Sequence, residues 1–351
     1  MSNIDLRILF SPRSSSSSSW VKSSFHLRVV ANKSRAMNRR LRRALNAILG
    51  PIFGITILIT SLFGDYIITI FTPIIFFDQH KLWRSVMDRA VSYWMLVPLT
   101  FLRYIFHIDV RVTGDSIEGD KPAIVVMNHR TRVDWLFLWI AIYKINPWLL
   151  TTSKYSMKAQ LRNLPGAGFG MAANQFIFLE RKIDEDKRRL SEAIEYYSKV
   201  GSKYQILIFP EGTDKTNYTT KKSNEYAKKN GLKELSYLLY PRSGGLTHMI
   251  EKMRQCNYIN CIYDVTIAYP DNVVQNELEL VLKGKVPKAV HFDIRRIDIS
   301  QVPKNANEMN NWINSLWIAK EAKLAAYYAK PKEHRNFDSG ENGFVWELIV
   351  H

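Results

Sequence analysis

The chain has 351 residues and carries 49 lysines and arginines against 32 acidic residues, a formal net charge of +17 with histidine neutral. A chain of this length can form one large domain or two ordinary ones, each with a proper core. Hydrophobic residues make up 46% and charged residues 23%, which excludes a disordered chain, and two cysteines are too few to staple a small secreted fold. No RRM, KH, zinc-finger or helix-turn-helix pattern accompanies the charge, so no nucleic-acid partner is predicted.

The first 43 residues hold ten lysines and arginines against one acid, Asp5, and include a serine run from Ser14 to Ser19. We interpret residues 1–43 as a basic, serine-rich, disordered tail that lies on the cytosolic, anionic leaflet of a membrane. The arginines, the serines and the scarcity of acids also fit a mitochondrial transit peptide, which stays open as an alternative.

Three apolar stretches follow and predict a membrane-embedded helical module over residues 44–107. The first, Ala44 to Gly64, has 21 residues without a charge and is long enough to cross a bilayer as a helix. The second, Tyr66 to Phe77, is too short to span alone, so single-pass, two-pass and re-entrant arrangements remain open. The third, Val91 to Leu102, is either an interfacial segment or an amphipathic helix that packs on a soluble domain.

From about Ile108 the sequence changes to short β-rich runs that alternate with helical patterns, which predicts an α/β domain: a mixed central sheet flanked by helices. We assign this domain to residues 108–300, and a C-terminal helix and tail to residues 301–351. The predicted strands are Asp109–Val112, Ala123–Met127, Leu149–Thr152, Gln175–Leu179, Gln205–Phe209, Tyr263–Tyr269, Leu278–Leu282 and His291–Arg295. The predicted helices are Asp134–Tyr143, Asp184–Lys199, Leu246–Arg254 and Glu308–Tyr327, with a surface loop or helix in the Lys-rich segment Lys215–Lys233.

A histidine and an aspartate stand at the junction of the first long apolar strand and the helix after it. His129 follows the strand, and Asp134 begins the predicted helix. Two residues with this spacing cannot meet inside one regular helix, but they can if the histidine is in the loop and the aspartate is in the first helical turn. Asp134 could then fix one imidazole nitrogen and leave the other as a free base, so that the nucleophile is supplied by the substrate.

Three further apolar strands are each followed by a polar or proline-bounded turn. Residues 210–214 (Pro-Glu-Gly-Thr-Asp) form a turn of the kind that aims backbone N–H groups and a carboxylate at a ligand. Residues 180–182 (Glu-Arg-Lys) put cations at a strand end, and residues 269–270 (Tyr-Pro) end the last of the three strands. Because α/β sheets bind ligands at the ends of their strands, these turns predict one shared crevice at one sheet edge.

These blocks together resemble those of the membrane-bound glycerophospholipid acyltransferases of the lysophosphatidate type. The first block of that family, an asparagine-histidine pair followed after four residues by an aspartate, is matched by residues 128–134. The second, an aromatic-rich strand that ends in arginine, is matched by residues 176–181, and the third, Phe-Pro-Glu-Gly-Thr, by residues 209–213. The fourth is looser and lies around residues 267–270.

The resemblance implies an acyl-CoA-dependent transferase that acylates a lysophospholipid at the membrane interface. It implies that His129 deprotonates a glycerol hydroxyl and that Asp134 orients the histidine, with no acyl-enzyme. Acyl-CoA is then a co-substrate, and neither a metal nor a cofactor is expected, because a thioester is already activated. Cys256 and Cys261 have neither the spacing nor the companions of a zinc site.

The same resemblance implies an acceptor-binding turn at Glu211, Gly212 and Thr213, with Arg181 as the partner of the phosphate. Many family members have an arginine where this chain has Asp214, and a carboxylate cannot bind phosphate as that arginine would. The cations expected to compensate are Arg181, Lys182, Arg242 and Lys215.

Within the family, residues 128–135, 209–214 and 240–242 most resemble the lysocardiolipin acyltransferase branch. That branch implies anionic acceptors, such as lysophosphatidylinositol, lysocardiolipin or lysophosphatidylglycerol, and an endoplasmic reticulum membrane. Its apolar segments near the C-terminus have no counterpart in residues 331–351, so that part of its topology is not carried over. Two other functions stay open: a 1-acylglycerol-3-phosphate acyltransferase that makes phosphatidic acid, and a non-catalytic lipid-binding membrane protein. The sequence predicts no oligomeric state.

Overall fold

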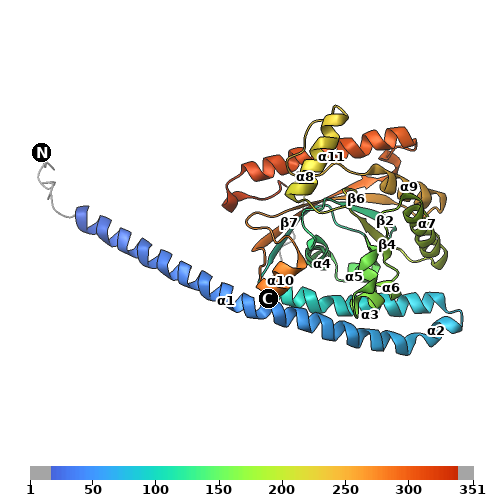
Figure 1. Ribbon diagram of the computed structural model, residues 1–351, viewed down its shortest axis with the longest axis horizontal. Helices are drawn as coiled ribbons and strands as arrows, with labels where there is room; N and C mark the ends of the chain where they lie inside the picture. Colours follow the sequence, from blue (N-terminus) through green and yellow to red (C-terminus); the bar gives the residue numbers. More distant parts are fainter. Residues whose placement is uncertain (1–16, 339–351) are drawn as a thin grey trace, which may run out of the picture.

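The computed structural model describes the backbone of residues 17–338 and the side chains of residues 40–338. In this part of the chain seven strands form one sheet, in the order β1-β7-β6-β2-β5-β3-β4 (Figure 1). All neighbours pair in parallel except β6 and β7, so the sheet is mixed and the predicted α/β class is confirmed. The strands are β1 Asp109–Gly114, β2 Ala123–Met127, β3 Ser153–Lys158, β4 Ile177–Leu179, β5 Gln205–Ile208, β6 Cys261–Ala268 and β7 Ala289–Asp298.

Helices cover both faces of this sheet (Figure 1). Strands β2, β5 and β6 are buried along their whole length, which explains why they read as continuous apolar runs. One apolar core lies between the sheet and α1 Ser17–Phe71, α3 His80–Thr100, α4 Asp134–Ile145, α5 Leu149–Thr152, α6 Ala167–Ala173 and α10 Glu277–Lys283. The second lies between the sheet and α7 Ile183–Val200, α8 Asn217–Lys229, α9 Ser243–Gln255 and α11 Ala306–Ala329. The short elements are α2 Pro73–Phe76, a π-helical turn Phe101–Ile105, and 3₁₀ turns at Ala159–Asn163, Ile299–Gln301 and Lys332–His334.

The N-terminal helix α1 is longer than the sequence predicts. Residues 17–43, expected to be disordered, belong to this helix, and residues 1–16 lie outside the described residues. The physical reason is composition, because no glycine or proline interrupts the chain between Ser17 and Leu49, and arginine, alanine and leucine favour helix. The division of the chain at residue 43 stays a prediction.

Helices α1 and α3 form an antiparallel hairpin along one side of the sheet domain (Figure 1). Met87, Val91, Met95 and Leu99 of α3 recur at helical spacing and are all buried, so the third apolar stretch packs on the domain as an amphipathic helix. Trp94 fixes the hairpin by donating a 3.2 Å hydrogen bond to a threonine of α1.

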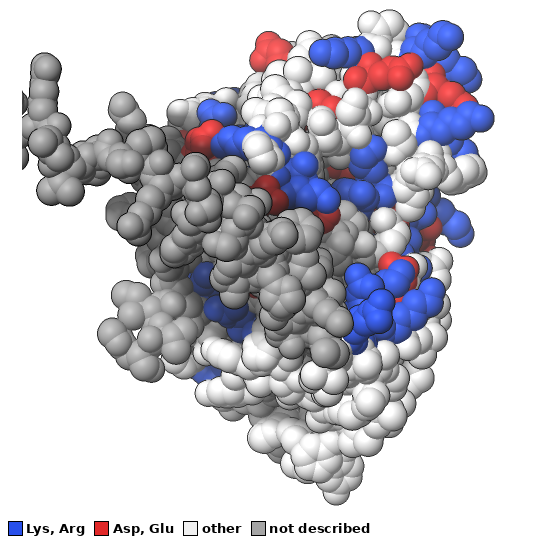
Figure 2. Space-filling model, turned by 90° about the vertical axis from the view of Figure 1, so that its left-hand side faces the viewer, with Lys and Arg blue, Asp and Glu red and all other residues white. Residues whose placement is uncertain are grey.

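The outer side of this hairpin is apolar and exposed. Along α1 many large apolar side chains, such as Ile55, Ile59 and Phe63, face outward, and soluble proteins rarely leave so long an apolar stripe exposed. Among the described residues one helix, Arg40–Phe76, is long and apolar enough to cross a membrane. Figure 2 agrees, because the lower end of the face it shows, on the side where Figure 1 places the hairpin, is white, without lysine, arginine, aspartate or glutamate.

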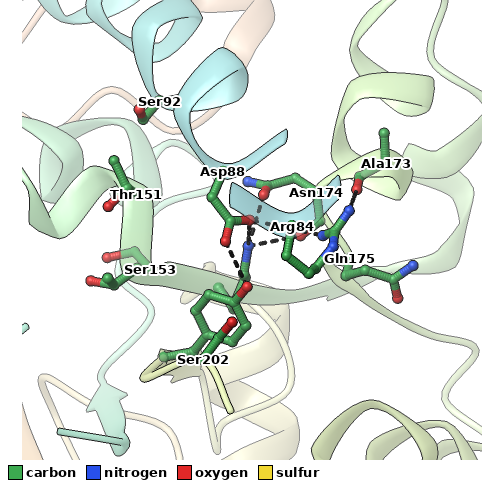
Figure 3. Close-up of polar contacts among 12 residues, drawn as sticks. Arg84, Asp88, Ser92, Thr151, Ser153, Ala173, Asn174, Gln175 and Ser202 are labelled. Carbon is green, nitrogen blue, oxygen red and sulfur yellow. Dashed lines mark hydrogen bonds and ion pairs between the residues drawn. The ribbon is translucent and has the colours of Figure 1, made fainter. Parts of the chain in front are cut away.

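A buried polar cluster ties α3 to the sheet (Figure 3). The ammonium of Lys154, on β3, contacts the Asp88 carboxylate at 2.7 Å and the side-chain oxygen of Asn174 at 2.7 Å. The Tyr204 hydroxyl donates to the other oxygen of Asp88 at 2.6 Å, and the Arg84 guanidinium donates to the carbonyl of the residue before Asn174. The cluster therefore joins the α1–α3 hairpin, β3 and the end of α6 through charge-assisted hydrogen bonds.

Two predicted strands are wrong. Leu149–Thr152 and Leu278–Leu282 lie in helices α5 and α10. The alternating Glu-Leu-Glu-Leu pattern imitates a strand, but Asn276 caps the helix by accepting from the backbone N–H of Glu279, and Gly284 ends it with a φ of 56°. The true strand near the first of these segments is β3, which sequence reasoning missed because its buried Lys154 hides its β character.

Candidate active site

The loop after β2 brings His129 and Asp134 together. Nδ1 of His129 lies 3.0 Å from Oδ2 of Asp134, with the histidine in the loop and the aspartate in the first turn of α4. Strands β2, β5 and β6 are parallel neighbours or share a neighbour, so their carboxyl ends meet at this edge, and β3 and β4 extend it. The turns after β2, β4, β5 and β6, which the sequence predicts to share one crevice, therefore lie at the same edge of the sheet.

Asp134 is fully buried, and its two oxygens accept four hydrogen bonds. Besides His129, the backbone N–H and the hydroxyl of Thr131 donate at 2.8 Å and 2.9 Å, and the hydroxyl of Tyr269 donates at 2.5 Å. The carboxylate is thus fixed from three directions, and with Nδ1 protonated the imidazole has one orientation.

The His129 ring stacks on Phe209, with ring centroids 4.1 Å apart, and keeps 16% of its side chain exposed. Its Nε2 atom has no hydrogen-bond partner among residues 40–338. A fixed imidazole with a free, accessible nitrogen can take a proton from a hydroxyl group. Neighbouring Asn128 locks the loop, because its side chain exchanges hydrogen bonds of 2.9 Å and 3.2 Å with the backbone of Ile267 on β6.

Glu211 begins the turn after β5 and is buried beside α11. Burial raises the pKa of this carboxyl to about 8, against the opposing effects of the His129 backbone N–H and the Lys320 ammonium. One oxygen accepts from the indole N–H of Trp317 at 3.4 Å, and the other has no hydrogen bond among the described residues. Glu211 therefore packs inward, against the C-terminal helix, and does not stand free at the surface.

The next residues of the turn bring two arginines together. Gly212 has a φ of 71°, a conformation that favours glycine, and its carbonyl accepts a 2.9 Å hydrogen bond from the guanidinium of Arg181. A β-carbon at Gly212 would lie 3.5 Å from Cδ of Arg242, so the Arg242 side chain runs along the same turn. Lys158 also lies near Arg181. Burial lowers the pKa of its ammonium most, and the positive charge of Arg181 lowers it further.

The remaining predicted residues are placed differently. Thr213 is half-buried in the turn, and Asp214 accepts a 3.2 Å hydrogen bond from the side chain of Gln275, so its carboxylate is turned toward the loop after β6. Lys182 is exposed just before α7, and in the described part of the chain its side chain forms no hydrogen bond or ion pair with the turn. The structure thus brings Arg181 and Arg242 together, but not Lys182.

Sequence reasoning missed the hydrogen bond of Tyr269, the cation at Lys158 and the participation of α11. Tyr269 lies in the fourth sequence block, residues 267–270, so the sequence placed it near the site. Its hydrogen-bond partner, Asp134, could not be predicted from the sequence. Lys158 and the helix residues Trp317 and Lys320 gave no local signal, because their contacts depend on sheet order and helix docking.

Comparison with known proteins identifies the family. The profile of the family described as "Acyltransferase" matches residues 109–269, and that described as "Acyltransferase C-terminus" matches residues 280–343. The chain is 52% identical over 88% of its length to "Lysophosphatidylinositol acyltransferase 10" of Caenorhabditis elegans, of which it covers 79%. It is 36% identical over 80% of its length to "Lysocardiolipin acyltransferase 1" of Gallus gallus, of which it covers 73%. Among solved structures, the 1-acyl-sn-glycerophosphate acyltransferase of Thermotoga maritima matches at 21% identity and a TM-score of 0.44, covering 78% of this chain and 98% of that chain.

The chain therefore belongs to the glycerophospholipid acyltransferase family, which confirms the resemblance drawn from its sequence blocks. It is an acyltransferase that acts on lysophospholipids, and it carries a helix long and apolar enough to cross a membrane.

Proposed function

We propose that this protein transfers the acyl group of an acyl-CoA to the free hydroxyl of an anionic lysophospholipid, foremost lysophosphatidylinositol. The observation that carries the chemistry is the buried, fully hydrogen-bonded Asp134 at 3.0 Å from Nδ1 of His129. The acceptor class is supported by the printed names of the relatives, one a lysophosphatidylinositol and one a lysocardiolipin acyltransferase. Lysocardiolipin and lysophosphatidylglycerol are the other acceptors of the proposed class.

In the proposed reaction Nε2 of His129 takes the proton of the acceptor hydroxyl while the hydroxyl oxygen attacks the thioester carbonyl carbon. The tetrahedral intermediate then collapses, the carbon–sulfur bond breaks, and the proton passes from Nε2 to the leaving sulfur. The products are a diacylated phospholipid and CoA, and the protein forms no covalent intermediate. Asp134 holds the imidazole in the required tautomer and stabilises the imidazolium that forms between the two steps.

The cations at the turn after β5 suit a phosphate group of a bound substrate. Arg181 and Arg242 flank Gly212, and Arg181 already holds the turn through its carbonyl. We assign Glu211, Gly212 and Thr213 to the acceptor-binding turn, with Glu211 shaping it from within. Lys182 has a lesser part, as an exposed cation at the rim.

The exposed apolar face of α1 would place this site at a membrane surface, where lysophospholipids are found. We propose the endoplasmic reticulum membrane, with a mitochondrial membrane as the alternative because of the basic, serine-rich N-terminus. Imaging a tagged full-length chain beside one without residues 1–43 tests this. A mitochondrial signal that the shortened chain loses would contradict the proposal.

The decisive experiment measures CoA release by the detergent-solubilised protein with oleoyl-CoA and one acceptor at a time. The acceptors are lysophosphatidylinositol, lysocardiolipin, lysophosphatidylglycerol and lysophosphatidate. We expect the fastest release with lysophosphatidylinositol and a loss of roughly 10²–10⁴-fold in His129→Ala. The matched control is His248→Ala, which removes a histidine on α9 that bonds Ser191. Release that is unchanged in His129→Ala would remove the proposed chemistry, and a preference for lysophosphatidate would reassign the acceptor.

A further inference from the structure

An open cavity of about 410 Å³ lies beside His129, between the loop after β2 and the start of α8. It is lined by Arg130 from the loop after β2, by Gln275 from the loop after β6, and by Lys215, Thr216, Asn217, Tyr218 and Thr220 from the segment that leads into α8. Each lining residue carries a polar or charged group, and neither Arg181 nor Arg242 is among them. The cavity is therefore a separate feature from the cationic turn already described.

Two cations stand together in this cavity without a carboxylate partner. The Arg130 guanidinium donates to the carbonyl of Lys215 at 3.1 Å, and the Lys215 ammonium donates to the Thr220 hydroxyl at 2.7 Å. Among residues 40–338 neither cation forms an ion pair, and burial followed by the charge of Arg130 lowers the pKa of Lys215. Holding two like charges side by side in a partly buried place costs free energy, which an anion in the cavity would offset.

Glu211 and Glu321, the acids whose charges oppose the lowering of the Lys215 pKa, are already committed to other partners. Glu321 accepts hydrogen bonds from the backbone N–H groups of Ser236, Tyr237 and Leu238 at 2.6, 3.0 and 3.0 Å. Glu211 is buried against Trp317, with a pKa of about 8. The positive charge of the cavity is thus left for a ligand.

The position of the cavity selects between the two substrates. Arg130 follows His129 directly, and the backbone N–H of Lys215 donates to the His129 carbonyl at 2.9 Å. In a lysophospholipid, only a short run of atoms separates the reacting glycerol hydroxyl from the phosphate. In acyl-CoA, the whole pantetheine arm separates the thioester from the nearest phosphate. An anion site on the loop that carries the base therefore suits the acceptor better than the donor.

From the pair Arg130 and Lys215 in this cavity, we infer that it is the headgroup site of the acceptor and that it takes a phosphate bearing a hydroxyl-rich substituent. The two cations bind the phosphate. Asn217 and Tyr218, whose side chains have no hydrogen-bond partner among the described residues, face the same cavity and suit the hydroxyls of a polyol. This inference rests on the proposed function for the identity of the substrate, but binding can be measured without turnover.

The kinetic test uses the full chain with Arg130→Gln and Lys215→Gln, each alone. We expect the KM for lysophosphatidylinositol to rise roughly 10–100-fold in each variant, while the KM for oleoyl-CoA stays within about twofold. The control is Lys228→Gln, which removes the same charge from the far end of α8, where the side chain is exposed and outside the cavity. A rise in the KM for oleoyl-CoA instead would show that the cavity binds the donor and would overturn the inference. Equal changes in the KM for lysophosphatidylinositol in all three variants would also overturn it.

A binding test keeps the inference falsifiable if those variants do not fold. In an otherwise native chain with Cys256→Ser, Asn217→Cys puts a thiol on the cavity wall, and the remaining Cys261 is buried. We expect glycerophosphoinositol, the soluble headgroup, to slow labelling of this thiol by maleimide at least threefold, and CoA to leave it unchanged. Protection by CoA alone, or by neither compound, would overturn the inference. If glycerophosphoinositol protects the thiol but the protein acylates no acceptor, the headgroup site is supported and the proposed function is contradicted.

Discussion

The hydroxyl of Tyr269, at the end of β6, donates a 2.5 Å hydrogen bond to Oδ1 of Asp134, whose other oxygen faces His129. The backbone N–H of Tyr269 in turn donates to the Tyr328 hydroxyl of α11 at 3.2 Å. The C-terminal helix thus reaches the candidate base through Tyr269 and Asp134. This gives a physical reason for the catalytic domain to be followed by that helix.

Tyr269→Phe removes this hydrogen bond and keeps the ring in place. We expect kcat to fall roughly 10–100-fold with little change in the KM for either substrate, because the Asp134 carboxylate is held less firmly. The variant should also change the pH dependence of kcat/KM, which a purely structural role would leave alone. Tyr327→Phe is the control, since it loses a buried 2.8 Å hydrogen bond to His291 away from the site. Equal losses of kcat in both variants would contradict a positioning role.

Asp134→Asn keeps the shape of the side chain but turns one acceptor into a donor. The amide then faces the Thr131 and Tyr269 donors or the His129 nitrogen with the wrong polarity. We expect kcat to fall by about 10²–10⁴-fold. Asp293→Asn serves as the control, because this buried aspartate accepts from Thr113 at 3.0 Å on the edge of the sheet. A variant at Asp134 that keeps most of the wild-type kcat would show that the histidine needs no carboxylate.

Glu211 gives the protein a pH-dependent stability. Its folded pKa is about 8, above the ordinary value of 4.5, so the folded state binds the proton more tightly than the unfolded state. The stabilisation is fully present below about pH 4.5 and is lost as the pH rises through about 8. Glu211→Gln cannot titrate at this position. As the pH rises from 5 to 8.5, its stability relative to the wild type should therefore increase by on the order of a few kcal/mol, which is measured as a rise in its melting temperature relative to that of the wild type. Glu225→Gln, at an exposed site of α8, should show no such trend, and a flat difference for Glu211→Gln would contradict the raised pKa.

The sequence was sufficient for features that depend on neighbours in the chain. His129 and Asp134 meet across a single strand-to-helix junction, so their spacing allowed a contact, and together with the other blocks it predicted the one observed at 3.0 Å. The buried strands β2, β5 and β6 were predicted because their apolar runs are short and bounded by polar turns.

Features that depend on sheet order could not be predicted in this way. The pairing of β5 with β2 places Lys215 beside Arg130, and the packing of α3 on the sheet places Asp88 beside Lys154, although each pair is far apart in the sequence. The prediction of a strand at Leu278–Leu282, which lies in α10, was wrong because it relied on the local pattern alone. The local pattern of this segment alternates like a strand, and its helical state depends on the Asn276 cap and on close packing against α1 at Gly50.

The buried cluster around Lys154 predicts that the α1–α3 hairpin and the sheet domain unfold together. Lys154 is fully buried, and its ammonium satisfies both Asp88 on α3 and Asn174 at the end of α6. Lys154→Met keeps much of the volume but leaves the Asp88 charge without its main partner, and Arg84, at 3.8 Å, replaces it only in part. We expect the free energy of unfolding to fall by about 3 kcal/mol, the lower end for breaking a buried ion pair.

The control for this prediction is Lys121→Met, which breaks a 2.8 Å surface ion pair with Glu118. Because water screens that pair, its loss should change the free energy of unfolding by less than about 1 kcal/mol. Denaturant unfolding in detergent, followed by tryptophan fluorescence, gives both values. Trp94 of the hairpin and Trp139 of α4 are in contact, with ring centroids 6.4 Å apart, so their fluorescence reports when the two parts separate. In Lys154→Met this separation should precede the rest of unfolding. A single transition at wild-type stability would show that the cluster does not couple the two parts.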